Sequence, residues 1–283
     1  MRVLILGANG QLGTFLQQTF SDHELLTPRH AELDMSHVSV ISALTDLAPD
    51  MVLLPAAYTN VDGCALDPER AFRENTLGAK YVALACRRRD IPLMYVSTNE
   101  VFSGTASVPY REYDQPAPVN AYGRSKWGGE QAVLQHAPTT YIARVAWLFG
   151  GQRNFIRTML KFGHERAQSG EALRVVDDEI GSPTYALDAA HAIRQLVDSQ
   201  IPGIYHIVNQ GSCSRYELAR YALDCAGINV QIEPIKLKDF QRPSTPPPFT
   251  PLHNGAAADL GITLRSWQDA VQAFVRVIQQ EQA

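Results

Sequence analysis

The sequence predicts an α/β fold built on a doubly wound parallel sheet, and three observations point to it. Short apolar runs alternate with helical patterns through the first half of the chain. A glycine-rich segment directly follows the first apolar run, where such folds turn from strand to helix. The 283 residues are 45% hydrophobic and 19% charged, which suits a chain that buries a substantial core. Since strands that alternate with helices pair in parallel, the first half is expected to form one sheet covered on both faces.

The elements of the first half follow one another in order. The apolar runs expected to form buried strands are Val3–Leu6, Met51–Leu54, Leu93–Val96 and Tyr141–Val145, with Glu24–Leu26 as a weaker second strand. The helical patterns are Leu12–Phe20, Val38–Leu47, Ala65–Arg89 and Tyr122–His136. Because a proline can begin a helix but not continue one, Pro68 is expected to divide the long third pattern into two helical pieces.

The second half is less regular and is expected to form a smaller C-terminal domain. Its predicted helices are Asn154–Gln168 and Thr184–Ser199, and its predicted strands are Leu173–Val176 and Ile204–Val208. Ser214 fits the N-cap of a further helix that runs to Ala226, because Glu217 three residues on completes a capping box. The proline-rich segment Arg242–Pro251 cannot form regular structure, and it is either a surface loop or a loop that covers the substrate.

Charge and cysteine patterns exclude several classes of function. The formal net charge is −4 and the basic runs are short, so no nucleic-acid partner is expected. The four cysteines show no CxxC spacing and the eight histidines no HExxH pattern, so no metal site is expected. Met1 leads directly into the first strand, and no apolar run approaches the ~20 residues of a membrane span. A cytoplasmic protein with reduced cysteines and no membrane partner is therefore expected.

The segment Gly7-Ala-Asn-Gly-Gln-Leu-Gly13 joins the first strand to the first helix. Glycines here allow a tight turn and let a pyrophosphate approach the backbone at the helix N-terminus. The spacing is GxxGxxG rather than GxGxxG, and alone it could mark only a strand-to-helix turn. In this position it predicts a Rossmann-like dinucleotide-binding domain. The residues expected at the cofactor are Gly7, Asn9, Gly10, Gln11 and Leu12.

The end of the second strand bears on the choice of cofactor. A chain that prefers NAD would carry an acidic residue there for the ribose 2′-hydroxyl, whereas this chain carries Arg29. Because a guanidinium suits a 2′-phosphate, NADPH is the expected cofactor, with NADH as an alternative, unless Arg29 is merely exposed. Asp34 could contact the adenine end. From these patterns we expect residues 1–150 and 183–209 to form the NADP-binding domain, and residues 151–182 and 210–283 the substrate-binding domain.

Small residues follow the strand Met51–Leu54. Ala56 and Ala57 would let a ligand lie against the backbone at the carboxyl end of a parallel strand. Tyr58 is expected either to touch the cofactor or to serve as plain packing. Asn75 is polar in an apolar neighbourhood, and it either braces the active site or lies at the surface.

Tyr122 and Lys126 carry the predicted chemistry. Four residues apart in a helix, they lie on one face, one turn from each other. The ordinary pKa of a phenol is about 10, and a nearby lysine cation lowers it. Thr98, if it faces the same pocket, could hold a carbonyl oxygen where the Tyr122 proton is delivered, with Ser97 beside the cofactor. This apparatus suits reduction of a ketone or oxidation of an alcohol beside a nicotinamide.

These motifs together resemble the extended short-chain dehydrogenase/reductase family and, more narrowly, its dTDP-4-dehydrorhamnose reductases. The similar segments cover nearly the whole chain: Gly10–Gly13, Tyr58–Asp62, Glu69, Glu74–Asn75, Pro118–Glu130, Trp147–Gly150, Asn154–Phe155, Val176–Thr184, Arg242–Pro243, Leu252, Asn254 and Trp267. GxxGxxG and YxxxK are specific only to the superfamily. The segments around Trp147 and Gly181–Thr184 narrow the resemblance.

The resemblance implies reduction of the C4 keto group of dTDP-4-dehydro-6-deoxy-L-mannose to give dTDP-L-rhamnose. It implies that Tyr122 is the proton donor, that Thr98 binds the carbonyl, and that Lys126 lowers the Tyr122 pKa and binds the nicotinamide ribose. Tyr122 and Lys126 would thus also touch the cofactor. The residues expected at the nucleotide-sugar substrate are Val61, Thr98, Asn99, Tyr122, Trp147 and Asn154; Trp147 could instead be a core aromatic.

Two departures from the family pattern matter. Asn99-Glu100 stands where the family usually has Asp-Tyr, and Glu100 resembles the related 4,6-dehydratases. An asparagine cannot donate and regain a proton at neutral pH, so dehydration is disfavoured, while the role of Glu100 stays open. Thr14–Leu16 replaces the glutamate with which some relatives build a magnesium-linked dimer, so a metal-free monomer or weak homodimer is expected.

Two other functions remain open at this stage. The same fold family includes a regulatory subunit of methionine adenosyltransferase, which binds NADP without turnover. A reductase or epimerase of another nucleotide sugar would also fit. The intact pair of Tyr122 and Lys126 favours an enzyme.

Overall fold

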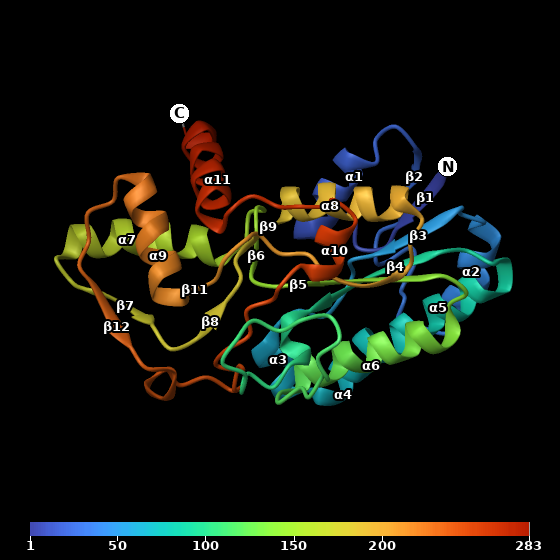
Figure 1. Ribbon diagram of the computed structural model, residues 1–283, viewed down its shortest axis with the longest axis horizontal. Coiled ribbons are helices and arrows are strands. Elements are labelled where there is room, and N and C mark those ends of the chain that lie inside the picture. The colour runs from blue at the N-terminus through green and yellow to red at the C-terminus, as the bar shows by residue number, and fades with distance from the viewer. Residues whose placement is uncertain (283) are drawn as a thin grey trace.

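The computed structural model describes residues 1–282, and a six-stranded parallel sheet forms the centre of its larger part (Figure 1). The strand order is β10-β5-β4-β3-β1-β2, with every neighbouring pair parallel. The strands are β1 (Arg2–Ile5), β2 (Glu24–Leu26), β3 (Met51–Leu54), β4 (Leu93–Thr98), β5 (Thr140–Val145) and β10 (Gly203–His206). The strand order reverses at β1, which creates the crevice where doubly wound folds bind ligands. The predicted fold class is confirmed.

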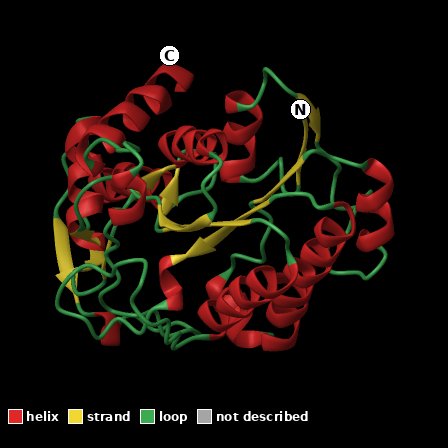
Figure 2. Cartoon of the chain, turned by 45° about the vertical axis from the view of Figure 1, so that its right-hand side comes forward, coloured by secondary structure: helices red, strands yellow, loops and turns green. Residues whose placement is uncertain are grey.

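Helices cover both faces of this sheet (Figure 2). One face carries α1 (Gln11–Thr19) and α8 (Ala186–Ser199), which pack against each other. The other carries α2 (Val40–Leu47), α5 (Gly78–Arg89) and α6 (Ala121–His136).

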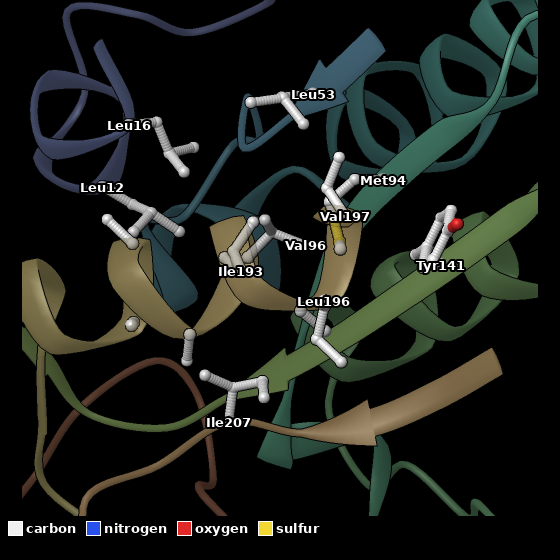
Figure 3. Close-up of a cluster of buried hydrophobic side chains, with 14 of the residues drawn as sticks. Leu12, Leu16, Leu53, Met94, Val96, Tyr141, Ile193, Leu196, Val197 and Ile207 are labelled. Atoms are coloured by element: carbon white, nitrogen blue, oxygen red, sulfur yellow. The ribbon is translucent and has the colours of Figure 1, made fainter. Parts of the chain in front are cut away.

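Each strand supplies alternate side chains to the two faces, because successive residues of a strand point in opposite directions. Met51 and Leu53 of β3 lie in the cluster under α1 and α8, whereas Val52 and Leu54 lie in the opposite cluster. Figure 3 shows the first cluster, where Leu16 of α1 and Ile193 and Leu196 of α8 gather over Leu53 and Met94. The near-continuous apolar strands of the sequence follow from burial on both faces.

A third apolar cluster lies beside the sheet, among elements that Figure 1 shows mostly at the left. It joins α7 (Phe155–Ser169), α9 (Arg215–Ala226) and α11 (Trp267–Gln282) with the parallel pair β7 (Leu173–Val176) and β12 (Ile232–Ile235). The short α10 (Gly255–Asp259) packs against β10 instead, and its Ala257 belongs to the first cluster. The proposed boundaries between the two domains stay a prediction.

The remaining elements are short. They are α3 (Val61–Leu66), α4 (Pro68–Ala71), the π-helix η1 (Phe72–Leu77), the 3₁₀ helices η2 (Asn99–Val101) and η3 (Leu237–Asp239), and the strands β6 (Leu148–Phe149), β8 (Ile180–Gly181), β9 (Thr184–Tyr185) and β11 (Cys213–Ser214). β6 pairs with β9, and β8 pairs with β11.

Several local predictions can be compared with these elements. Pro68 does begin a helix, and the Ser214–Glu217 capping box is present. The helix predicted from Thr184 is wrong at its start, because Thr184 and Tyr185 form β9 and the helix begins at Ala186. Among residues 1–282, no helix combines the length and apolarity that a membrane crossing requires.

Candidate active site

A pocket of about 560 Å³ opens at the carboxyl ends of β1, β3, β4 and β5. Most residues predicted from the sequence line it: Gly7, Gly10, Gln11, Leu12, Ala56, Ala57, Val61, Ser97, Thr98, Asn99, Tyr122, Lys126 and Trp147. The fold therefore brings the glycine turn and the Tyr122–Lys126 pair to one cavity. Asn9, Arg29, Asp34, Tyr58 and Asn154 do not line it.

The glycine turn is shaped by close backbone contacts. Gly7 has a φ of +93°, and a Cβ there would lie 2.8 Å from the Cα of Ala56. A Cβ on Gly13 would run into the carbonyl oxygen of Gly7, so the third glycine lets α1 pack against the turn. No side chain caps the N-terminus of α1, where Gly10 is the N-cap. Free N–H groups at such a helix start form a site for a pyrophosphate.

Ser97 offers a further sign of a ligand in this pocket. Its side chain is only 2% exposed, and its Oγ has no hydrogen-bond partner among residues 1–282. A buried polar atom without a partner is costly unless a ligand or water satisfies it. The uncapped helix start and this hydroxyl both fit a bound dinucleotide.

The Tyr122 phenol is held at the first turn of α6. Asn120 caps this helix by accepting a hydrogen bond from the Gly123 N–H at 2.8 Å. Burial raises the pKa of Tyr122, the negative charge of Glu100 raises that pKa further, and a hydrogen bond with Thr98 opposes the shift. The expected lowering of this pKa by Lys126 is wrong for this structure, because burial dominates. A phenol in this state keeps its proton at neutral pH.

Lys126 is buried and lies one helical turn after Tyr122 in α6. Its Nζ donates to the Val96 carbonyl oxygen at 2.7 Å and lies 4.1 Å from the centre of the Tyr95 ring. Burial lowers the pKa of Lys126 to about 7, and the negative charge of Glu130 opposes this shift. The ammonium is therefore near its point of titration at neutral pH.

Thr98 and Asn99 link the pocket to the proline-rich segment. The Thr98 hydroxyl lies 3.3 Å from Asn99 Oδ1, and Asn99 Nδ2 donates to Thr250 Oγ1 at 2.6 Å. Farther along, Asp62 Oδ1 accepts hydrogen bonds from Arg242 Nε at 2.9 Å and from the Ser244 hydroxyl at 2.8 Å. The segment is thus fastened against the pocket wall rather than lying loose at the surface.

Trp147 adopts a strained backbone conformation, with a φ of +43° that bulky residues rarely take. The Arg215 guanidinium lies 3.5 Å from the centre of its indole ring, and a Cβ on Gly181 would come within 2.5 Å of the same ring. Arg215 also pairs with Glu179 at 2.9 Å. Arg153 and Arg215 line the pocket although the sequence analysis did not single them out. In the sequence, Arg215 is only the residue after the Ser214 N-cap. Its place in the pocket wall follows from where α9 packs in the fold.

The residues outside the pocket wall have other contacts. Arg29 is exposed, and Asp34 Oδ1 accepts hydrogen bonds from the backbone and side chain of Ser36, each at 2.8 Å. Asn154 caps α7 through the Arg157 N–H. Tyr58 packs its ring under the Arg70 guanidinium, at 4.2 Å. The part of these residues in ligand binding stays a prediction.

Asn75 is buried and braces two walls of the site. Its side chain forms hydrogen bonds with both backbone groups of Tyr58, at 2.7 and 3.1 Å. Its Nδ2 also donates to Ser125 Oγ at 2.9 Å, next to Lys126 on α6. Asn75 lies in the π-helix η1, an irregularity that often occurs at functional sites. Of the two interpretations left open by the sequence, bracing is confirmed as a structural role.

Comparisons with known proteins bear on this site. The family model described as "RmlD substrate binding domain" matches residues 1–280. The dTDP-4-dehydrorhamnose reductase of Mycolicibacterium smegmatis is 35% identical, over 98% of this chain and 86% of its own. A crystal structure of such a reductase from Clostridium acetobutylicum has a TM-score of 0.94 and 32% identity, covering 99% of this chain and 100% of its own. One from Bacillus anthracis, in complex with NADP, has a TM-score of 0.92 and 34% identity over 96% of this chain and 98% of its own.

The fold and the site define the class of this protein, an oxidoreductase of the extended short-chain dehydrogenase/reductase type. Its glycine turn and its tyrosine–lysine pair share one pocket, as that chemistry requires. The chain belongs to the dTDP-4-dehydrorhamnose reductase family. The resemblance found in the sequence is confirmed.

Proposed function

We propose that this chain uses NADPH to reduce the C4 keto group of dTDP-4-dehydro-6-deoxy-L-mannose, forming dTDP-L-rhamnose. One observation supports this above all. Thr98, Tyr122 and Lys126 line the same pocket as the glycine turn at the start of α1. A proton donor and a site for a nicotinamide dinucleotide are thereby adjacent, which carbonyl reduction needs.

NADPH, when bound, supplies the hydride that adds to C4. In our proposal the Tyr122 hydroxyl donates its proton to the C4 oxygen, and its raised pKa ensures that the proton is present at neutral pH. Thr98, which lines the same pocket as Tyr122, holds that oxygen in place. Lys126 binds the ribose next to the nicotinamide and takes part in returning a proton to the phenol.

The remaining site residues belong to the same proposal. Gly7, Asn9, Gly10, Gln11, Leu12, Arg29, Asp34, Ala56, Ala57, Tyr58 and Ser97 would contact the cofactor. Val61, Asn99, Trp147 and Asn154 would border the sugar nucleotide. Residues 1–150 and 183–209 would then carry cofactor binding, and residues 151–182 and 210–283 would carry substrate binding.

Predictions of the cellular location and of the oligomeric state complete the proposal. A cytoplasmic location is supported by the free state of all four cysteines, since oxidising compartments favour disulfides. A monomer or weak homodimer is supported by the absence of the first-helix glutamate from the sequence at Thr14–Leu16.

The proposal is tested by following absorbance at 340 nm with NADPH and freshly prepared dTDP-4-dehydro-6-deoxy-L-mannose. We expect NADPH to be consumed and dTDP-L-rhamnose to form in equal amounts. Folded protein that binds NADPH but does not consume it would instead support the non-catalytic binder. Consumption only with a different keto-sugar nucleotide would move the assignment to that substrate.

A further inference from the structure

Glu100 is a carboxylate in the catalytic pocket that the reduction itself does not use. It lines the pocket together with Thr98 and Tyr122. Its Oε2 accepts a hydrogen bond from Asn120 Nδ2 at 2.7 Å, two residues before Tyr122. Its backbone carbonyl packs so closely against Gly123 that a Cβ there would overlap it. The carboxylate is therefore held in a fixed position beside the proton donor.

The second oxygen of this carboxylate is free of protein partners. No hydrogen bond to Glu100 Oε1 and no ion pair of Glu100 occur within residues 1–282. The nearby cations are already engaged, since Arg215 pairs with Glu179 at 2.9 Å and Arg242 with Asp62 at 2.9 Å. Burial, together with the charge of Glu179, raises the pKa of Glu100, and the Asn120 hydrogen bond opposes this shift.

Glu100 is partly buried and lines the pocket, so a ligand that brings a hydrogen-bond donor into the pocket can satisfy the carboxylate oxygen that no protein group contacts. In a 6-deoxyhexopyranose that is oxidised at C4, one neighbouring carbon, C3, carries a hydroxyl. The other, C5, carries the ring oxygen and a methyl group. Among the two neighbours of the reacting carbon, only C3 therefore offers a hydrogen-bond donor.

We propose that Glu100 Oε1 accepts a hydrogen bond from the substrate hydroxyl on C3, and that Glu100 selects for sugars that carry this hydroxyl. The assignment rests on the proposed function, since it places the C4 oxygen at Tyr122 and Thr98. It makes Glu100 a specificity-determining residue that touches the substrate. Asn120 acts through Glu100, because it holds the other carboxylate oxygen.

The test compares dTDP-4-dehydro-6-deoxy-L-mannose with its 3-deoxy analogue in wild-type protein and in Glu100→Gln and Glu100→Ala. A hydrogen bond to a charged group corresponds to a preference of about 10- to 100-fold in kcat/KM for the 3-hydroxy substrate. We expect the preference to fall to a few-fold, about 2–5, in Glu100→Gln, whose amide can present only a donor to the pocket. In Glu100→Ala we expect a ratio of about 1.

Controls separate this effect from a loss of fold. Glu233→Gln makes the same chemical change at an exposed position on β12 and should keep the wild-type ratio. Glu100→Gln retains an oxygen for Asn120, so it should fold normally, and its dissociation constant for NADPH should equal that of wild type.

Three results would overturn the assignment. The first is a wild-type preference that persists in both Glu100 variants, which would place recognition of the hydroxyl elsewhere. The second is a wild-type protein that reduces both substrates equally well. The third is a Glu100-dependent exchange of the C3 or C5 hydrogen of dTDP-4-dehydro-6-deoxy-L-mannose for deuterium, measured in heavy water with NADP⁺ bound. This result would show that Glu100 removes a proton from a substrate carbon.

The role of Glu100 in recognising the C3 hydroxyl can still be tested if the proposed function is wrong. If wild-type protein does not reduce the 3-hydroxy substrate, calorimetric binding of dTDP-L-rhamnose and its 3-deoxy analogue to the NADP⁺-loaded protein replaces turnover. Equal binding of the two, or binding of neither, overturns the inference. Turnover of the parent substrate without a role for Glu100 would overturn the inference alone and leave the proposed function standing.

Discussion

The ammonium of Lys126 lies 4.1 Å from the centre of the Tyr95 ring, while the Tyr95 hydroxyl donates to the Lys126 carbonyl oxygen at 3.3 Å. Both side chains are almost completely buried. One tyrosine thus contacts the charged end and the backbone of the same lysine. Burial penalises the cation and lowers the pKa of Lys126 to about 7, and the electron-rich face of the ring lies where it can stabilise the ammonium.

Tyr95→Leu should therefore shift the pH profile of kcat/KM. Loss of a desolvated cation–π contact of about 2 kcal/mol would lower the Lys126 pKa by about 1–1.5 units. The ammonium is lost as the pH rises through its pKa, so the limb of the profile that reports Lys126 should move to lower pH. Glu130, whose charge opposes the lowered pKa, stays in place. The profile is measured between pH 5.5 and 9.

Tyr95→Phe is the matched control, because it keeps the ring and removes only the hydroxyl. We expect a loss of about 1 kcal/mol of stability from the missing hydrogen bond and no movement of the limb. Identical pH profiles for the leucine and phenylalanine variants would show that the ring face does not support the cation.

Lys126 should also leave a signature in the pH dependence of stability. Its pKa in the folded protein is about 7, below the ordinary value of 10.5, so the unfolded chain binds more protons between these two values. The free energy of unfolding contributed by this group therefore rises with pH across that window and is constant below pH 7. Lys126→Met removes the contribution. We expect the stability advantage of the variant over wild type to be largest near pH 6 and to shrink toward pH 10, in urea unfolding. An advantage that does not change with pH would show that Lys126 is not destabilised by burial.

Tyr122→Phe should remove at least about 100-fold of the reductase activity, the scale of general acid catalysis. The ring that packs in the pocket is kept, so NADPH should bind with an unchanged dissociation constant. Tyr113→Phe provides a control, because Tyr113 is 78% exposed. Activity is measured as NADPH consumption. Full activity of the phenylalanine variant at position 122 would assign the proton to another group.

Local sequence patterns are sufficient to predict the main parts of the site. The strands are buried on both faces, so their apolar runs were distinct, and four-residue spacing placed Tyr122 and Lys126 on one helix face. The predicted start of α8 is wrong because Thr184 and Tyr185 pair with β6, and local helix propensity carries no information about such a long-range strand pairing.

Long-range contacts decided what the sequence left open. Asn75 braces the site through Ser125, fifty positions away, and this bond could not be inferred from its neighbours. The π-helix around Asn75 and the approach of Arg215 to the Trp147 ring depend on packing between separate elements. The same holds for the direction of the Tyr122 pKa, which is set by burial rather than by the nearby lysine.

Glu130, which ends the Pro118–Glu130 segment one helical turn after Lys126, serves stability. Its carboxylate forms a two-pronged ion pair with Arg144, at 2.9 and 2.7 Å, and both side chains are at most 2% exposed. Removing one partner leaves a buried charge unpaired, so Glu130→Ala should cost about 3–5 kcal/mol in urea unfolding. Replacing both with apolar residues, as Glu130→Leu with Arg144→Met, should cost clearly less than the sum of the single changes. Glu165→Ala breaks an exposed pair with Lys161 and should change stability by less than about 1 kcal/mol. Strictly additive effects of the two core replacements would mean that Glu130 and Arg144 are not coupled, despite their geometry.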